Sequence, residues 1–146
     1  MWIWIVLGVV AGTGVATQAL INTRLGSFVG STFVAGTISF AVGLTSLLVV
    51  MVAQPAGTLR MQAIRSAPWW AFVGGALGAF FIVATIYGVP RVGAALWLSA
   101  AVLGQVTFSL VADHFGFFGV TVHAVSLPRL AGIVLVIAGV VMVRMF

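Results

Sequence analysis

Long apolar blocks, separated by short stretches with polar residues, glycine or proline, make up almost the whole chain. A helix that crosses a membrane needs about 20 consecutive, mostly apolar residues. The hydropathy pattern predicts such helices near residues 2–22, 30–53, 68–88, 92–112 and 128–146. We therefore expect an all-α integral membrane protein, a compact bundle of five transmembrane helices in a single domain spanning residues 1–146.

Residues near the block ends support these limits. Pro68 and Pro128 suit the first turn of a helix, and Tyr87, Gly88 and Pro90 separate the third block from the fourth. The segment 113–127 is unusually apolar for a loop, so we expect it to lie in the membrane interface or to re-enter the membrane. Tryptophan favours the interface. The tryptophans near predicted ends are Trp2, Trp4, Trp69 and Trp70.

Composition excludes several classes of protein. The chain is 63% hydrophobic and 5% charged, whereas soluble domains have about 25% charged residues. Its net charge of +5 comes from scattered arginines and does not form the basic patch of a nucleic-acid-binding protein. The absence of cysteine and of a histidine cluster leaves no disulfide framework and no metal site. We expect no cofactor.

The arginines are divided equally between the two predicted faces of the membrane. Arginine-rich loops stay cytoplasmic, so an equal division gives no preferred orientation, unless a misplaced boundary hides a bias. The balance favours dual topology and an antiparallel homodimer of ten helices. In many transporters two inverted halves bind substrate between them at mid-depth. The face of the N-terminus has Arg60, Arg65 and Arg129, and the other has Arg24, Arg91 and Arg144.

Small residues recur at helical spacings and predict close packing of helices. Such spacings are common in membrane helices and indicate a compact bundle rather than a substrate site. The residues assigned to packing are Gly8, Gly12, Gly36, Ser39, Gly43, Gly74 and Gly78.

Two stripes of polar residues are the candidate lining of a binding cavity. Residues four apart lie on one face of a helix, and unpaired amides are costly in hydrocarbon. If the stripes converge, they form a midplane cavity for a neutral or mixed polar and aromatic substrate; hydrogen bonding between helices is the alternative. A cationic substrate is not favoured, because no mid-membrane carboxylate is present. The stripes are Gln18 and Asn22 in the first span, and Trp97, Gln105 and Ser109 in the fourth.

Asp113 and His114 are the candidate site for proton coupling. Histidine titrates near neutral pH, but the predicted place of the pair is the edge of a span. The alternative is that the carboxylate pairs with a nearby arginine or is hydrated. No nucleophile and base are predicted within reach of each other, so we do not expect an enzyme.

Seven segments taken in order resemble the YdcZ-type family of small bacterial inner-membrane proteins, a group of unknown function in the drug/metabolite transporter superfamily. They are residues 18–26, 39–43, 68–70, 74–81, 104–105, 113–116 and 129–133. The resemblance implies a multi-pass protein of the bacterial inner (plasma) membrane with an exporter role. Family members occur as single genes, as oppositely oriented pairs and as fused proteins, which agrees with dual topology. The small multidrug resistance relatives use a first-helix glutamate, and amides stand in that region here.

These observations lead to one main functional hypothesis, a small-molecule exporter that works by alternating access as an antiparallel homodimer. Its cavity would be lined by the first and fourth spans. A passive pore and a non-transporting accessory subunit are the alternatives.

Overall fold

The computed structural model describes residues 2–54 and 61–146, and these parts of the chain contain helices and no strands. Within them, five helical segments are long and apolar enough to cross a membrane, which confirms the all-α membrane fold expected from the hydropathy pattern. The Cα positions group the chain into two units, Met1–Arg91 and Val92–Phe146, and each unit is described by itself.

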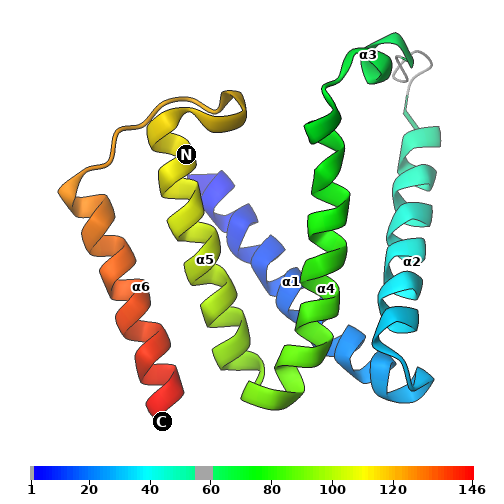
Figure 1. The fold of residues 1–146 in the computed structure, drawn as a ribbon, viewed down its shortest axis with the longest axis horizontal. Coiled ribbons are helices and arrows are strands. Elements are labelled where there is room, and N and C mark those ends of the chain that lie inside the picture. The colour runs from blue at the N-terminus through cyan, green and yellow to red at the C-terminus, as the bar shows by residue number, and fades with distance from the viewer. Residues whose placement is uncertain (1, 55–60) are drawn as a thin grey trace. The chain divides into compact units, whose positions relative to one another are not determined.

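The first unit contains three of these segments (Figure 1). Helix α1 (Trp2–Val29) runs obliquely to α2 (Thr32–Val52) and α4 (Val73–Val92). Between α2 and α4 lie a short helix, α3 (Met61–Ser66), and a 3-10 turn, η1 (Trp69–Phe72), which leads directly into α4.

Helix α1 is longer than the predicted span, which ended near residue 22. Polar residues such as Asn22 and Arg24 lower the hydropathy, but they do not interrupt a helix, and α1 continues to Val29. It ends next to Gly30, whose φ of 69° lies in the left-handed region that favours glycine. At about 1.5 Å per residue, α1 is about 42 Å long and exceeds the hydrocarbon core of about 30 Å.

Helix α4 also differs from its predicted end near residue 88. The helix continues through Pro90 to Val92, and the chain turns at Gly93, where φ is 85°. Proline removes one backbone hydrogen bond, and in the last turn of a helix this loss does not end it earlier. The residue that ends α4 is therefore the glycine and not the proline.

A small hydrophobic core holds the first unit together. Ala35, Ile82 and Ile86 are buried, with Leu25 packed against them. A β-carbon at Gly26 would lie 3.0 Å from Cγ2 of Ile86. This glycine therefore allows the end of α1 to approach α4 closely.

The second unit is a pair of antiparallel helices, α5 (Ala94–Phe115) and α6 (Leu127–Met145) (Figure 1). A 3-10 turn, η2 (Phe117–Gly119), follows α5. Because α5 continues to Phe115 and is capped by Gly116, with φ of 67°, Asp113 and His114 belong to its last turn rather than to the predicted loop.

Large apolar side chains cover the outside of these helices. Trp2, Trp4 and Trp69 are each at least 74% exposed, and most leucine, valine and phenylalanine side chains are exposed as well. In water such a surface would aggregate, whereas in a bilayer it faces lipid.

Candidate functional site

In the first unit, a cavity of about 440 Å³ that opens to the surface lies between α1, α2 and α4. Its walls combine large apolar side chains with the small residues of α2. At about 1.5 Å per residue, its α2 lining lies about 10–22 Å from the Thr32 end of a helix about 31 Å long. The lining residues are Val15, Gln18, Ser39, Phe40, Gly43, Leu44, Leu47, Gly78, Phe81 and Ile82.

A narrow recess of about 10 Å³ lies beside this cavity, between α1 and α4. Val15, Gln18, Phe81 and Ile82 line both spaces, so the recess and the cavity share part of their walls. The residues that line the recess alone are Ala19, Asn22 and Thr85.

The recess contains most of the polar groups of the site. Asn22 is 5% exposed and Thr85 is 2% exposed. No side-chain hydrogen bond of Asn22 occurs within the described residues, yet neither of its amide atoms is completely enclosed. The amide therefore has unused hydrogen-bonding capacity next to the recess.

The cavity and the recess have no charged side chain among their described lining residues. The nearest arginine in sequence, Arg24, lies over the ring of Phe28, with Cζ 4.4 Å from the ring centroid. A buried ion needs a partner of opposite charge, so this lining suits a neutral molecule.

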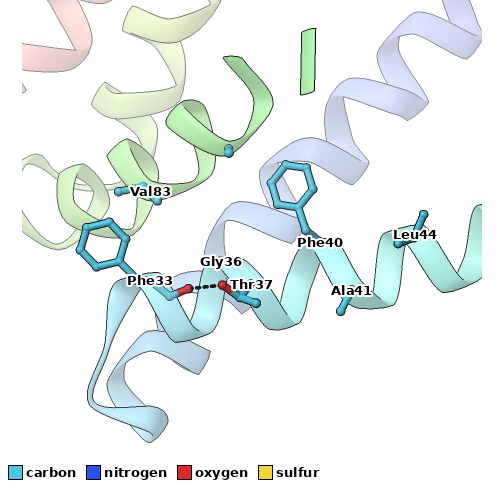
Figure 2. Close-up of a pocket in the computed structure, with 8 residues that line it drawn as sticks. Phe33, Gly36, Thr37, Phe40, Ala41, Leu44 and Val83 are labelled. Atoms are coloured by element: carbon cyan, nitrogen blue, oxygen red, sulfur yellow. Dashed lines mark hydrogen bonds between the residues drawn. The ribbon is translucent and has the colours of Figure 1, made fainter. Parts of the chain in front are cut away.

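A second hollow lies between α2 and α4 and shares Phe40 and Leu44 with the cavity (Figure 2). This apolar groove of about 630 Å³ is lined by residues that include Phe33, Thr37, Phe40 and Val83. The hydroxyl of Thr37 already donates to the backbone oxygen of Phe33 at 2.9 Å. Because the groove presents no unused side-chain donor among its described residues, it offers little for recognising a polar substrate.

The residues assigned to packing fall into two groups. A β-carbon at Gly36 would lie 3.6 Å from Cγ2 of Ile82, and one at Gly78 would lie 3.4 Å from Cζ of Phe40. Ser39, Gly43 and Gly78 line the cavity as well. A β-carbon would meet no described atom within 4 Å at four of these positions, which are Gly8, Gly12, Gly43 and Gly74.

The second polar stripe belongs to α5 in the other unit. Trp97 is partly buried, and Gln105 and Ser109 are exposed. Ser109 lines a groove of about 360 Å³ between α5 and α6 together with Asp113 and Arg129. The convergence of this stripe with Gln18 and Asn22 stays a prediction.

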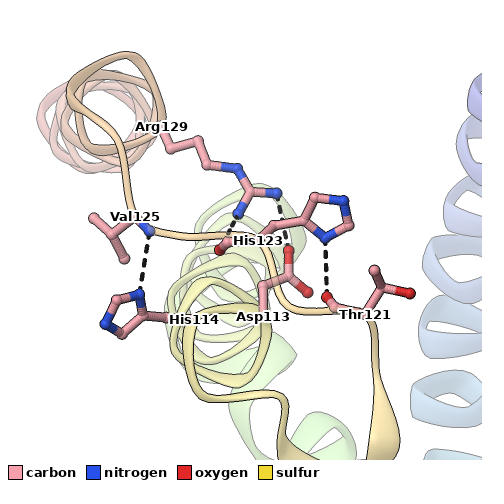
Figure 3. Close-up of polar contacts among 6 residues, drawn as sticks. All are labelled: Asp113, His114, Thr121, His123, Val125 and Arg129. Atoms are coloured by element: carbon pink, nitrogen blue, oxygen red, sulfur yellow. Dashed lines mark hydrogen bonds and ion pairs between the residues drawn. The ribbon is translucent and has the colours of Figure 1, made fainter.

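Asp113 forms an ion pair at the junction of α5 and α6 (Figure 3). Nη2 of Arg129 donates to Oδ2 of Asp113 at 2.9 Å, and Nη1 donates to the backbone oxygen of His123 at 3.2 Å. The backbone N–H of His123 in turn donates to the backbone oxygen of Asp113 at 2.9 Å. Of the two alternatives for this carboxylate, the structure shows pairing with arginine.

The two histidines fix the connection between these helices (Figure 3). Nδ1 of His114 accepts from the backbone N–H of Val125 at 3.3 Å. Nδ1 of His123 lies 2.9 Å from the backbone oxygen of Thr121 and must carry a proton to donate to it. We call this set of contacts, made by Asp113, His114, His123 and Arg129, the α5–α6 clasp.

We expect the ion pair of the clasp to contribute about 1 kcal/mol to stability, because its two side chains are 36% and 32% exposed. Asp113→Asn and Arg129→Gln should each lower the free energy of unfolding in detergent. The double variant should lower it by little more than either single variant does. Urea titration of the purified variants measures this. Arg144→Gln is the control, and fully additive losses would contradict the pairing.

Sequence reasoning missed Thr85 and the aromatic walls. Threonines in membrane helices commonly bond to their own helix, as Thr13, Thr17 and Thr45 do here, so a single threonine carries little signal. Thr85 interrupts an apolar block four residues after Phe81, and this spacing was the available clue. A group of acidic, histidine or cysteine residues that could hold a metal is absent from the described residues.

The five long apolar helices define a class, that of small multi-pass membrane proteins. The family model described as "Putative inner membrane exporter, YdcZ" matches residues 3–142, and the chain belongs to this family. It is 26% identical to the inner membrane protein YdcZ of Escherichia coli (strain K12) over 136 residues, 93% of this chain and 91% of the relative. No solved structure matches the chain. The protein is therefore a multi-pass protein of the inner membrane.

Proposed function

We propose that this protein exports a small molecule by alternating access, as an antiparallel homodimer of ten transmembrane helices, and does not catalyse a reaction. The observation that carries the proposal is the cavity of about 440 Å³ with amide groups beside it, inside a single unit of the chain. Membership of an exporter family supports the direction of transport.

The lining favours a neutral substrate, or one with mixed polar and aromatic character. Phe40 and Phe81 offer aromatic surface, and Gln18 offers a donor and an acceptor. A cationic substrate would lack a compensating carboxylate, because the lining contains no acidic residue within the described part of the chain. We propose the lipid bilayer and a second, inverted copy as its other partners, and no nucleic acid.

An inverted pair of copies has a two-fold symmetry that a single copy lacks. Two copies with opposite orientations have the two-fold symmetry of many secondary transporters, whose substrate sites lie near mid-depth. The cavity lining on α2 lies in the middle part of that helix, as such a site requires. The stripe formed by Trp97, Gln105 and Ser109 on α5 would complete the pathway.

Counterflow in proteoliposomes tests the proposal. Liposomes loaded with an unlabelled neutral aromatic amphiphile should accumulate the labelled compound in a saturable way. Gln18→Leu and Gln105→Leu should each lower the initial rate at least about tenfold, because each removes a polar group of the proposed pathway. The amount of dimer is measured in parallel by crosslinking.

The outcomes distinguish the proposal from the alternative functions, a pore and an accessory subunit. Loss of the dimer in either variant would assign that amide to helix packing. Single-channel currents through the purified protein would identify a pore. Co-purification with a larger membrane protein in fixed ratio, with no counterflow by the protein alone, would identify an accessory subunit.

A further inference from the structure

The recess beside the cavity has a polar group with nothing to bind. Asn22 is only 5% exposed, and its amide makes no hydrogen bond within the described residues. Among the described residues, every completely enclosed side-chain nitrogen or oxygen atom has a hydrogen-bond partner. The amide of Asn22 has none, so its atoms must belong to the small exposed part of this side chain. An amide without a hydrogen-bond partner among apolar side chains costs free energy, so a group that pairs with it is favoured.

The size of the recess restricts that group. A space of about 10 Å³ corresponds to about one water-sized sphere, which is the smallest space that holds a water molecule. The group that fits is therefore about the size of one non-hydrogen atom with its hydrogens, as in a water molecule or a substrate hydroxyl group. A carboxylate or a guanidinium group is too large for it.

The chemistry of the lining restricts the group further. The carboxamide of Asn22 both donates and accepts, so its best single-atom partner also does both. A carbonyl oxygen only accepts. A primary amine is protonated at neutral pH, and no acidic side chain among the described lining residues would neutralise it. A hydroxyl group meets every condition.

The neighbouring cavity determines what the rest of the bound molecule can be. Phe40, Leu44, Leu47 and Phe81 give it a mostly apolar wall, and Gln18 lies where the two spaces share their lining. A molecule with its hydroxyl at Asn22 would place an apolar or aromatic body in this cavity.

We propose that the transported substrate is a neutral alcohol with an apolar or aromatic body, and that Asn22 is the residue that recognises its hydroxyl group. This inference rests on the proposed function, in which the cavity of the first unit binds the substrate. It adds the chemical class of the substrate and a specificity-determining residue.

Binding of a matched pair of probes tests the proposal. The probes are 4-(4-fluorophenyl)butan-1-ol and its deoxy analogue, 1-butyl-4-fluorobenzene, measured by fluorine NMR with the protein in nanodiscs. Empty nanodiscs correct for partition into lipid. The wild type should prefer the alcohol about tenfold after this correction, and Asn22→Leu should abolish the preference while still binding the deoxy probe.

Two controls keep the result interpretable. Gln54→Leu changes an exposed amide just after α2 and should retain the preference. The corresponding amine, 4-(4-fluorophenyl)butan-1-amine, should bind the wild type more weakly than the alcohol, and this comparison needs no variant. An amine that binds as well as the alcohol would overturn the inference.

The remaining outcomes distinguish this inference from the proposed function. If both probes bind equally well, or if the preference survives in Asn22→Leu, the hydroxyl assignment is wrong and the cavity remains the binding site. A further variant, Gly43→Leu, places a larger side chain in the cavity. If no probe binds more strongly than to empty nanodiscs, or if Gly43→Leu binds the alcohol as well as the wild type does, the cavity is not the binding site and both proposals fail.

Discussion

Replacing Gly43 by leucine is expected to lower substrate binding and transport at least about tenfold while leaving the protein folded. Gly43 lines the cavity, and a β-carbon at this position would meet no described atom within 4 Å. The leucine side chain therefore has room to extend into the space that we assign to the substrate. Binding of the fluorinated alcohol in nanodiscs and counterflow in liposomes measure the loss.

A matched control separates blocking of the cavity from a general effect of a larger residue. Gly75 lies on α4, lines none of the hollows described above, and would also meet no described atom within 4 Å as a β-carbon. Gly75→Leu should keep wild-type binding and counterflow. Equal losses in both variants, or full binding by Gly43→Leu, would contradict the assignment of the cavity.

The membrane-spanning helices were predictable because lipid imposes one simple requirement, an apolar stretch of sufficient length. Their ends were less predictable, because hydropathy falls before a helix stops. Asn22 and Arg24 ended the first predicted span, whereas the helix ends beside Gly30. In the same way, Pro90 lies inside α4 and Gly93 makes the turn. Backbone conformation, not polarity, determined both ends.

Half of the candidate site follows from helical spacing alone. Gln18 and Asn22 lie four residues apart on α1, so any structure that keeps this helix places them on one face. The partners across the recess, Phe81 and Thr85, come from α4 and depend on how the helices pack. That packing is set by side-chain shape at contacts such as Gly26 with Ile86, which hydropathy does not report.

The small residues of α2 show why packing and binding are difficult to separate in a sequence. Gly36 approaches Ile82 of α4, while Ser39 and Gly43, further along α2, line the cavity. A small side chain brings two helices together where they touch and leaves space where they diverge. The angle between the helices decides which of the two happens, and a spacing pattern contains no angle.

The ion pair of Asp113 with Arg129 likewise depended on structure, because the two residues lie 16 positions apart. The path of the connection between α5 and α6 brings them together through His123. The pairing gives Asp113 a structural role at the end of a helix. Proton coupling through Asp113 and His114 stays a prediction.

Changing the arginine balance of one loop is expected to fix the orientation of the protein and abolish transport by each variant alone. The loop between the second and third spans contains Arg60 and Arg65. Adding charge with Gln54→Arg and Gln62→Arg should hold this loop in the cytoplasm, and Arg60→Gln with Arg65→Gln should place the opposite face there. Reporters at the C-terminus, one active only inside and one only outside, measure orientation at matched expression.

Co-expression of these two oppositely biased variants provides the decisive comparison. Only a mixed pair can then be antiparallel, so transport should return to near the wild-type level, while the wild type alone gives comparable signals from both reporters. If each variant transports by itself in a single orientation, inverted pairing is unnecessary and a parallel assembly must form the pathway. If the wild type activates one reporter only, the equal division of arginines does not produce dual topology. Restored transport would instead show that the two-fold symmetry of the exporter comes from two copies of one chain.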